Sequence, residues 1–356
     1  MTIPNSSSKV PIKVGIIGTG GISDAHFKGY MAAGSEIVAI ADVNPEALKA
    51  RQEEWGVAKG YTDAAQLLAD PEVQAVSICT PNAFHHPATV AAAKAGVHIL
   101  CEKPISLNLE LAQEMIDAAE EAGVVLQIGH HLRSNESAAK AKAMIDAGKL
   151  GRITSIKLRQ AHDWGGAKTV KPSFGLKANA GGGTLLDNGC HMFDLARYFG
   201  GDVAEVYGTT ATLKYDVEVE DTAFVTLRYA SGALGVVENT WSATGWEESF
   251  AIYGTEGSLE YGNRLDADPV LRWRFRSSVG TTWAGTDLAV FDYFTEGVRR
   301  RNHSLHIANF LAAIRGERDV ICTGQDGLEA VRLVLKSYES AELGRPVALT
   351  PEPVSV

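Results

Sequence analysis

The segment Val14–Ser23, VGIIGTGGIS, joins an apolar run to a helical stretch. Gly18 and Gly20 fill the first two positions of the pattern GxGxxG, and Ser23 holds the third, where Gly or Ala is usual. The first glycine permits a tight turn, and the second lets a pyrophosphate approach the backbone at the N-terminus of a helix. The alternative is a strand–helix turn that binds no ligand. The residues around the loop are therefore needed to choose between the two interpretations.

Asp42 stands at the end of the next apolar run, where an acidic side chain binds the ribose hydroxyls of a dinucleotide. We therefore predict a dinucleotide site. No Lys or Arg adjoins Asp42 to hold a 2′-phosphate, which favours NAD, while Lys49 and Arg51 on the following helical stretch leave NADP as the less favoured alternative. The loop residues assigned to the cofactor are Gly18, Gly20, Gly21 and Ile22.

The first third of the chain alternates short apolar runs with amphipathic helical stretches. Its predicted strands are Ile12–Ile17, Glu36–Ala41, Gln74–Cys79, Val97–Leu100 and Val124–Ile128. Its predicted helices are Pro45–Trp55, His86–Lys94 and Asn108–Ala122. Runs that are apolar almost throughout are typical of strands covered on both faces, so the alternation predicts right-handed βαβ crossovers and a doubly wound parallel sheet of the Rossmann type.

Beyond about residue 150 the pattern changes to strands with few helices between them. The predicted strands are Ile153–Gln160, Val203–Leu213, Thr222–Tyr229, Ala233–Thr240, Ser249–Tyr253 and Gly257–Tyr261. The predicted helices are Thr184–Phe199, His306–Arg315 and Gln325–Leu343. Several of these strands alternate apolar and polar residues, which is typical of a mostly antiparallel sheet with one covered face.

We therefore predict an α/β protein with an N-terminal doubly wound parallel sheet and a C-terminal α+β domain built on a large, mostly antiparallel, open-faced sheet. The expected divisions are a loose tail at 1–10, a dinucleotide-binding domain at 11–129 and a substrate-binding and oligomerisation domain at 130–356. An open sheet face needs a cover, so we expect a homodimer or homotetramer joined through it.

The charge, hydropathy and cysteine spacing of the chain disfavour several classes of function. The 356 residues carry 33 Lys and Arg against 43 Asp and Glu, a formal net charge of 33 − 43 = −10, which disfavours nucleic-acid binding. No apolar run is long enough to cross a membrane, and the start of the chain, MTIPNSSSKVP, lacks the apolar core of a signal peptide. Four widely spaced cysteines without zinc-ligand spacing predict reduced thiols, no metal site and a cytoplasmic location: Cys79, Cys101, Cys190 and Cys322.

Polar clusters follow two more of the predicted strands. One is Ser77–His85, SICTPNAFH, and the other is Leu100–Pro104, LCEKP. Ligands of open α/β sheets bind at the carboxyl ends of the strands, so both clusters are expected at the same crevice as the glycine loop. Taken singly, the alternatives are a plain turn at the first cluster and a charged loop at the second.

A third cluster, Gly181–Asp194, GGGTLLDNGCHMFD, lies in the second predicted domain. Asp187 and His191 are four residues apart, so on a helix they share one face. Apolar residues on the opposite face serve for packing, which leaves these two side chains free to face a cleft. The alternatives are a capping box of Thr184 with Asp187 and a core position for His191.

Together these motifs resemble the Gfo/Idh/MocA oxidoreductase family, which includes glucose–fructose oxidoreductase and inositol dehydrogenases. The resemblance rests on GTGGIS at Gly18–Ser23, AD at Ala41–Asp42, TPNAFH at Thr80–His85, EKP at Glu102–Pro104 and GGGTLLDNGCH at Gly181–His191. The segment Ser337–Val347 also resembles the family's last helix, so the resemblance covers nearly the whole chain. It implies a Rossmann domain, a C-terminal domain with an open-faced sheet, and oligomers built on that sheet.

The resemblance also implies the site residues. It assigns catalysis to Lys103, Asp187 and His191. It places the nicotinamide cofactor against residues at the two strand ends, namely Thr80, Asn82, His85, Glu102 and Lys103. These residue types suit the oxidation of a secondary alcohol, with His191 as general base, Lys103 as a donor to the reacting oxygen, and Asp187 as an anchor for the substrate or for His191. We also hypothesise that the Lys103–Pro104 bond is cis and aims Lys103.

Substrate recognition is assigned to Lys103, Asp187 and His191 together with two further histidines. His162 follows the first strand of the second domain, and His131 follows the last Rossmann strand. A loop histidine without a role in binding is the alternative for His162. Four tryptophans are candidates either to stack on a pyranose or to pack in a core, namely Trp164, Trp241, Trp246 and Trp283.

The leading hypothesis is an NAD-dependent dehydrogenase that acts on a secondary hydroxyl of a sugar, glycoside or inositol. Two alternatives stay open: a hydrolase or lyase of the same family that recycles NAD, and a non-catalytic sensor of dinucleotide or sugar. The presence of Lys103, Asp187 and His191 argues against the sensor.

Overall fold

The structure is a computed structural model that describes residues 10–163, 174–262, 269–281, 287–298 and 303–349. The expected loose tail falls outside these residues except at its last position, and Trp164 and Trp283 also lie outside them. The chain divides into two compact units. Unit 1 takes the described residues of Met1–Ser134, Ala178–Gly181 and Arg301–Arg332. Unit 2 takes those of Asn135–Lys177, Gly182–Arg300 and Leu333–Val356.

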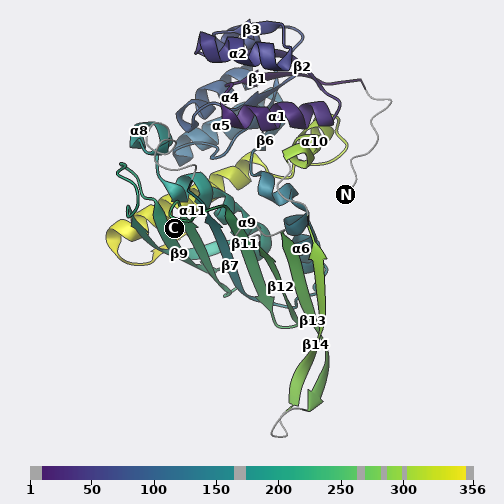
Figure 1. Cartoon of the computed structure of the whole chain (residues 1–356), viewed down its shortest axis with the longest axis vertical. Coiled ribbons are helices and arrows are strands. Elements are labelled where there is room, and N and C mark those ends of the chain that lie inside the picture. The colour runs from purple at the N-terminus through teal and green to yellow at the C-terminus, as the bar shows by residue number, and fades with distance from the viewer. Residues whose placement is uncertain (1–9, 164–173, 263–268, 282–286, 299–302, 350–356) are drawn as a thin grey trace, which may run out of the picture. The chain divides into compact units, whose positions relative to one another are not determined.

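Unit 1 is built on a parallel sheet in the order β3-β2-β1-β4-β5-β6 (Figure 1). Its strands are β1 (Lys13–Ile17), β2 (Glu36–Ala41), β3 (Lys59–Tyr61), β4 (Ala75–Ile78), β5 (His98–Cys101) and β6 (Leu126–Ile128). The strand order reverses between β1 and β4, and ligands of doubly wound sheets bind at such a switch point. The sheet confirms the predicted Rossmann architecture and places the glycine loop, which follows β1, at the switch point.

Helices connect these strands. They are α1 (Gly21–Ala32), α2 (Pro45–Trp55), α3 (Ala64–Leu68), α4 (His85–Lys94) and α5 (Leu109–Ala122). Short 3-10 turns follow β4 and β6 at Asn82–Phe84 and His131–Ser134. On α5 the residues Ala112, Met115, Ile116 and Ala119 are buried and Leu109 is partly buried, which agrees with the amphipathic pattern of the predicted helix Asn108–Ala122.

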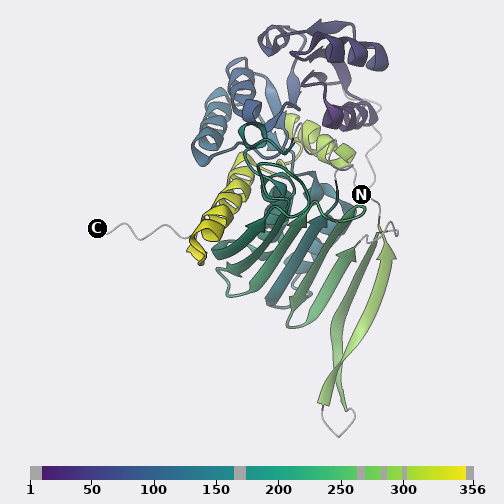
Figure 2. The same cartoon turned by 60° about the vertical axis from the view of Figure 1, so that its left-hand side comes forward.

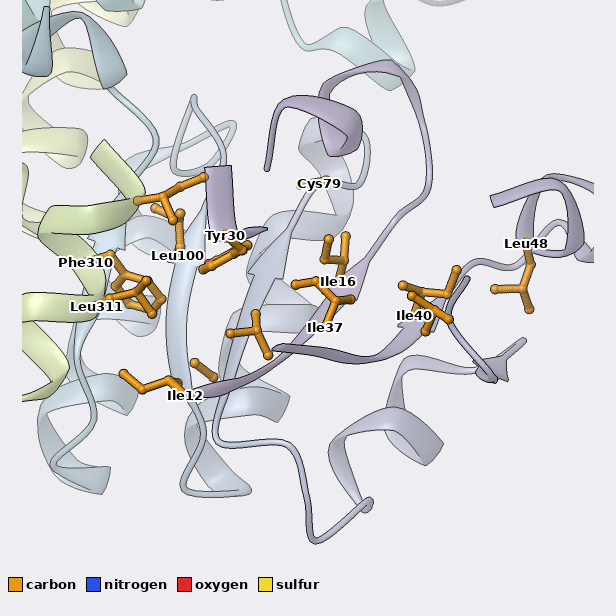
Figure 3. Close-up of a cluster of buried hydrophobic side chains, with 14 residues drawn as sticks. Ile12, Ile16, Tyr30, Ile37, Ile40, Leu48, Cys79, Leu100, Phe310 and Leu311 are labelled. Carbon is orange, nitrogen blue, oxygen red and sulfur yellow. The ribbon is translucent and has the colours of Figure 1, made fainter. Parts of the chain in front are cut away.

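A helix from late in the chain completes the core of unit 1. On α10 (His303–Ile314), Ile307, Phe310 and Leu311 are buried in one cluster with side chains of β1 and α1. Figure 3 shows Phe310 and Leu311 facing Leu100 of β5 and Ile12, which directly precedes β1. The close approach requires a glycine on α1, because a Cβ at Gly29 would lie 2.3 Å from Cδ1 of Ile307.

Unit 2 is built on a nine-stranded sheet in the order β14-β13-β12-β11-β7-β10-β9-β8-β15 (Figure 2). Its strands are β7 (Ile153–Ala161), β8 (Val203–Ala211), β9 (Thr222–Tyr229), β10 (Leu234–Thr240), β11 (Glu247–Gly254), β12 (Gly257–Gly262), β13 (Val270–Thr281), β14 (Asp287–Gly297) and β15 (Val347–Ala348). Only β7 and β10 pair in parallel, so the predicted mostly antiparallel sheet is confirmed.

One face of this sheet is covered and the other is open. Helix α9 (Cys190–Gly200) packs on the covered face, where the rings of Phe199 and Phe250 lie 5.1 Å apart. Along β9, buried residues alternate with exposed ones. Apolar side chains of the open face are strongly exposed, with values of 42% at Tyr207, 50% at Phe224 and 53% at Leu234. The remaining helices are α6 (Glu136–Asp146), α8 (Lys177–Ala180) and α11 (Gly324–Leu343).

Candidate active site

The glycine loop is tight on one side and open on the other. Gly18 has a φ of +90°, and a Cβ there would lie 2.7 Å from the carbonyl carbon of Cys79. A Cβ at Gly20 would meet nothing within 4 Å. Ser23, which replaces the third glycine of the pattern, is fully buried and donates its hydroxyl to the Gly20 carbonyl at 2.5 Å. The open side of Gly20 at the start of α1 therefore fits a pyrophosphate.

The acid at the end of β2 lies against this loop. Oδ2 of Asp42 accepts hydrogen bonds from the backbone N–H and the hydroxyl of Thr19, both at 2.8 Å. Arg51 of α2 donates to the Thr19 carbonyl at 3.2 Å, pairs with Glu54 and lies over the ring of Trp55. These contacts hold Arg51 beside the same glycine loop that Asp42 contacts.

The loop after β4 contacts the loop after β5 through one imidazole. Nδ1 of His85 lies 2.7 Å from the carbonyl oxygen of Pro104, and Nε2 lies 3.0 Å from the carbonyl oxygen of Thr80. Burial lowers the pKa of His85, while the hydrogen bonds to Pro104 and Thr80 work in the opposite direction. Asn82 donates to the carbonyl of Ala180 at 3.1 Å. His85 is therefore enclosed, and its ring fixes the backbone of the two predicted cofactor loops.

Glu102 forms a buried ion pair that the sequence analysis did not find. Its Oε1 lies 2.9 Å from Nε2 of His26, and Nδ1 of His26 lies 2.9 Å from the hydroxyl of Ser77. Burial alone would lower the pKa of His26, but Cys79 and the carboxylate of Glu102 raise it to about 10. Burial alone would raise the pKa of Glu102, but His26, and then Lys103, lower it to about 2. Each partner of the pair therefore favours the charged form of the other.

Lys103 follows directly after this carboxylate. Its backbone N–H donates to Oε2 of Glu102 at 3.2 Å, and the Lys103–Pro104 bond is cis, as hypothesised. His131 is buried, and its ring stacks on that of His303 with centroids 3.9 Å apart. These residues all belong to unit 1.

Asp187 and His191 belong to unit 2, on a helical stretch with an unusual start. The segment Leu185–Gly189 is π-helical and continues into α9, so Asp187 lies in the π turn and His191 in the first α turn. Both side chains are buried. π turns often occur at functional sites, because they change the direction of individual side chains within a helix.

The capping box of Thr184 with Asp187, which was the alternative interpretation of this segment, does not form. The Thr184 side chain makes no capping hydrogen bond. The carboxylate of Glu220 instead accepts from the backbone N–H groups of Gly183 at 3.0 Å and Leu185 at 2.9 Å. Sequence reasoning missed Glu220, since only its position just before a strand marks it in the chain.

Two further candidates for substrate binding lie together in unit 2. The ring of His162 stacks on that of Trp246, with centroids 4.3 Å apart and planes inclined by 5°. Trp241 is different, because it is fully buried and donates its indole N–H to Oδ1 of Asn188 at 2.9 Å. Trp241 thus packs in the core and anchors the segment that carries Asp187.

Two family comparisons match most of the chain. Residues 12–130 match the family described as an oxidoreductase family with an NAD-binding Rossmann fold, and residues 138–260 match the GFO/IDH/MocA C-terminal domain. The chain belongs to the Gfo/Idh/MocA oxidoreductase family. This Gfo/Idh/MocA member is therefore an oxidoreductase of a family that includes inositol and sugar dehydrogenases.

Individual relatives match over almost their whole length. Myo-inositol 2-dehydrogenase of Thermotoga maritima is 30% identical over 345 residues, which are 95% of this chain and 98% of that protein. The 1,5-anhydro-D-fructose reductase of Ensifer adhaerens is 32% identical, covering 93% of this chain and 96% of that protein. A levoglucosan dehydrogenase solved with NADH and levoglucosan has a TM-score of 0.85 at 28% identity, covering 96% of this chain and all of that one.

Other kinds of site find no support in the described part of the chain. Within it, no group of three or more His, Cys, Asp or Glu side chains could hold a metal ion. None of its helices is long and apolar enough to cross a membrane. All four cysteines are buried and form no disulfide, as predicted.

Proposed function

We propose that this Gfo/Idh/MocA member is an NAD-dependent dehydrogenase that acts on a secondary hydroxyl of a sugar, glycoside or inositol. The observation that carries the proposal is that Asp187 and His191 are both buried on one π-to-α helical stretch, in a chain that also has Gly18 and Gly20 of the glycine loop and Lys103. In the proposed reaction, Lys103, Asp187 and His191 act on the same substrate.

Each of these residues has a separate task in the proposed reaction. Oxidation of CH–OH to C=O removes a hydride and a proton from the substrate, and bound NAD supplies the hydride acceptor. His191 accepts the hydroxyl proton, because an imidazole is basic near neutral pH. Lys103 donates a hydrogen bond to the oxygen as negative charge grows on it. Asp187 orients His191 or the substrate, and in the reverse direction His191 returns the proton.

The unit 1 loops supply the proposed cofactor site. Gly20, Gly21 and Ile22 bind the pyrophosphate, and Asp42 binds the ribose hydroxyls of the adenosine. Two observations support this cofactor site. A Cβ at Gly20 would meet no neighbouring atom, and Arg51 is bound to the Thr19 carbonyl and to Glu54. The predicted nicotinamide contacts are Thr80, Asn82, His85, Glu102 and Lys103, with His85 acting through the loops that it joins.

The stacked rings of His162 and Trp246 form one wall of the proposed substrate pocket. Aromatic faces bind the apolar C–H side of a pyranose or inositol ring, while imidazole and carboxylate groups bind its hydroxyls. Relatives named for activity on myo-inositol, 1,5-anhydro-D-fructose and levoglucosan support a neutral cyclic polyol. His131 is a further proposed contact.

A turnover screen tests the proposed function. The full-length protein is incubated with inositols, aldoses, glycosides and levoglucosan, each with NAD and with NADP, and formation of reduced nicotinamide is followed by absorbance. We expect turnover with at least one cyclic polyol, and a kcat lowered by about 10²–10⁴-fold in His191→Ala. Lys103→Met is expected to lower kcat more than it weakens cofactor affinity.

Three outcomes of this screen contradict the proposal. Full activity of His191→Ala rules out the general base. Turnover of a substrate without net reduced nicotinamide indicates that NAD is recycled within the reaction. Binding of cofactor and sugar with no turnover of any kind indicates a sensor.

A further inference from the structure

One residue holds the start of the helical stretch that carries Asp187 and His191. The backbone N–H groups of Gly183 and Leu185 donate to the Glu220 carboxylate at 3.0 and 2.9 Å. The N–H of Thr184, between them, donates to the Glu220 backbone carbonyl at 2.9 Å. Three successive amides, which the first turn of a helix leaves without intrahelical partners, therefore all bind Glu220.

Tyr338 of α11 fixes this carboxylate from the other side. Its phenol donates to Oε1 of Glu220 at 2.8 Å, the same oxygen that accepts from Leu185. Burial raises the pKa of Glu220, and the hydrogen bonds from Leu185 and Tyr338 counteract that rise. A negative charge here also interacts favourably with the amide dipoles of the helix start. Tyr338 thus restrains both the direction and the charge of the Glu220 side chain.

The glycines before the helix are explained by the same contacts. A Cβ at Gly182 would lie 2.3 Å from the phenol oxygen of Tyr338, and a Cβ at Gly183 would lie 1.8 Å from the Glu220 carbonyl oxygen. Only glycine therefore allows both partners to reach the backbone. The GGG motif before the helix, whose role the sequence analysis left unassigned, here makes room for Glu220 and Tyr338.

These backbone contacts continue along the chain to Asp187 and Asn188. The N–H of Asp187 donates to the Gly183 carbonyl at 2.9 Å, one turn from Glu220. Next to Asp187, the side chain of Asn188 accepts from the indole N–H of Trp241, and the backbone N–H of Trp241 donates to the carbonyl of Asp221 at 2.8 Å. Residues 220 and 221 thus fix both ends of the turn that carries Asp187.

We propose that Glu220, held by Tyr338, is a positioning residue that places Asp187 and His191 for proton transfer through the backbone of Gly183–Leu185. The inference rests on the proposed function, in which Asp187 and His191 handle the proton of the substrate. All four side chains belong to unit 2, so the argument does not depend on unit 1.

Tyr338→Phe and Glu220→Gln test this role. The first removes one hydroxyl and keeps the ring, and the second keeps the shape but replaces one acceptor by an NH₂ group. Glu218→Gln is the matched control for the carboxylate, since Glu218 is exposed on the same loop. Tyr253→Phe is the control for the phenol, because Tyr253 donates to Glu260 at 3.1 Å elsewhere in unit 2.

Two readouts separate positioning from mere support of the fold. In full-length protein with ¹³C-labelled histidine, the His191 ring signal is assigned by its loss in His191→Gln and titrated by NMR. We expect the pKa of His191 to move by about 0.5 or more in Tyr338→Phe and in Glu220→Gln, and to stay unchanged in both control variants. With the polyol turned over best, we expect kcat to fall about tenfold in Tyr338→Phe and further in Glu220→Gln, with KM and NAD affinity nearly unchanged.

The outcomes distinguish this inference from the proposed function. If both variants keep the His191 titration and the kcat of the wild type, Glu220 is not a positioning residue. If the wild type oxidises no polyol, the proposed function fails, and the His191 titration alone then decides whether Glu220 sets the surroundings of that imidazole. If Glu220→Gln does not fold, Tyr338→Phe is the milder change and by itself tests whether Glu220 is a positioning residue.

Discussion

Nε2 of His26 lies 2.9 Å from Oε1 of Glu102, and both side chains are buried in unit 1. Removing one partner of a buried ion pair leaves the other charge without compensation, which costs about 3–5 kcal/mol. We therefore expect His26→Leu to lower the free energy of unfolding by about that amount in urea denaturation. Lys28→Ala, which breaks the exposed Lys28–Asp24 pair on the same helix, should change it little. Equal effects of the two substitutions would contradict the prediction.

The same pair predicts how stability depends on pH. The pKa of His26 is raised from 6.5 to about 10, so its contribution is fully present below about pH 6.5 and is lost as the pH rises towards 10. The pKa of Glu102 is lowered from 4.5 to about 2, so its contribution is present above about pH 4.5 and is lost as the pH falls towards 2. The stability difference between wild type and His26→Leu should therefore shrink between about pH 6.5 and pH 9. A difference that stays constant across this range would show that the charge of His26 contributes nothing.

The two glycines of the cofactor loop should respond to substitution in opposite ways. Gly18→Ala puts a side chain at a φ of +90° and against the Cys79 backbone, so we expect a loss of about 2 kcal/mol or more in unfolding free energy. Gly20→Val has space for its Cβ, so the fold should keep its stability while NADH affinity falls about tenfold or more, because the side chain occupies the path of the pyrophosphate. Thermal unfolding and calorimetric titration with NADH measure the two effects. Unchanged NADH affinity in Gly20→Val would place the pyrophosphate elsewhere.

Asp42 decides the cofactor preference in our proposal. Asp42→Ala should weaken NAD binding about tenfold or more, through loss of two ribose hydrogen bonds, and should weaken NADP binding less, because a repelling charge is removed at the same time. The dissociation constants of NADH and NADPH, measured for wild type and Asp42→Ala, test this prediction. If NAD affinity stays at the wild-type value, the proposed cofactor site is wrong.

The open face of the unit 2 sheet predicts the oligomeric state. Exposed apolar side chains on this face, such as Tyr207, Phe224 and Leu234, favour burial against a second copy. We expect a dimer or tetramer in sedimentation velocity, and a shift towards monomer in Phe224→Asp. Leu213→Asp, at an exposed leucine just beyond β8, is the matched control. A wild type that sediments only as monomer at micromolar concentration would contradict the prediction.

Much of the fold could be read from local patterns, because parallel strands buried on both faces form dense apolar runs. The bounds of β2 and α2 agree with the prediction. The edge strand β3 was missed because it has three residues, one of them glycine. The strand β13 was also missed, although Leu271 and Trp273 alternate with arginines in the period of a strand.

Long-range partners were out of reach of sequence patterns. The motifs around Asp42, Asp187 and His191, together with the family resemblance, led to the chemistry proposed for them, while a capping box and a core histidine were the open alternatives for the last two. Glu102 and His26 are 76 residues apart, and no local pattern announces their contact. Glu220 acts on a helix start 37 residues earlier in the chain, where the nearby Thr184 offered a local cap that the fold does not use. Tertiary packing decided each of these choices.

Helix α10 belongs to unit 1 but lies late in the sequence, which has a consequence for biosynthesis. Ile307, Phe310 and Leu311 fill the core beside β1 and α1, yet about 180 residues are translated between Ser134 and Ile314. At ~5–20 residues per second, the ribosome needs roughly 10–35 s to supply them. During that interval the apolar side chains that α10 covers, such as Ile12 and Tyr30, lack this cover, and exposed apolar surface of this kind is prone to aggregation. A recombinant fragment that stops near residue 134 would leave the same side chains uncovered, so we expect it to be less soluble than the full chain because it lacks one helix.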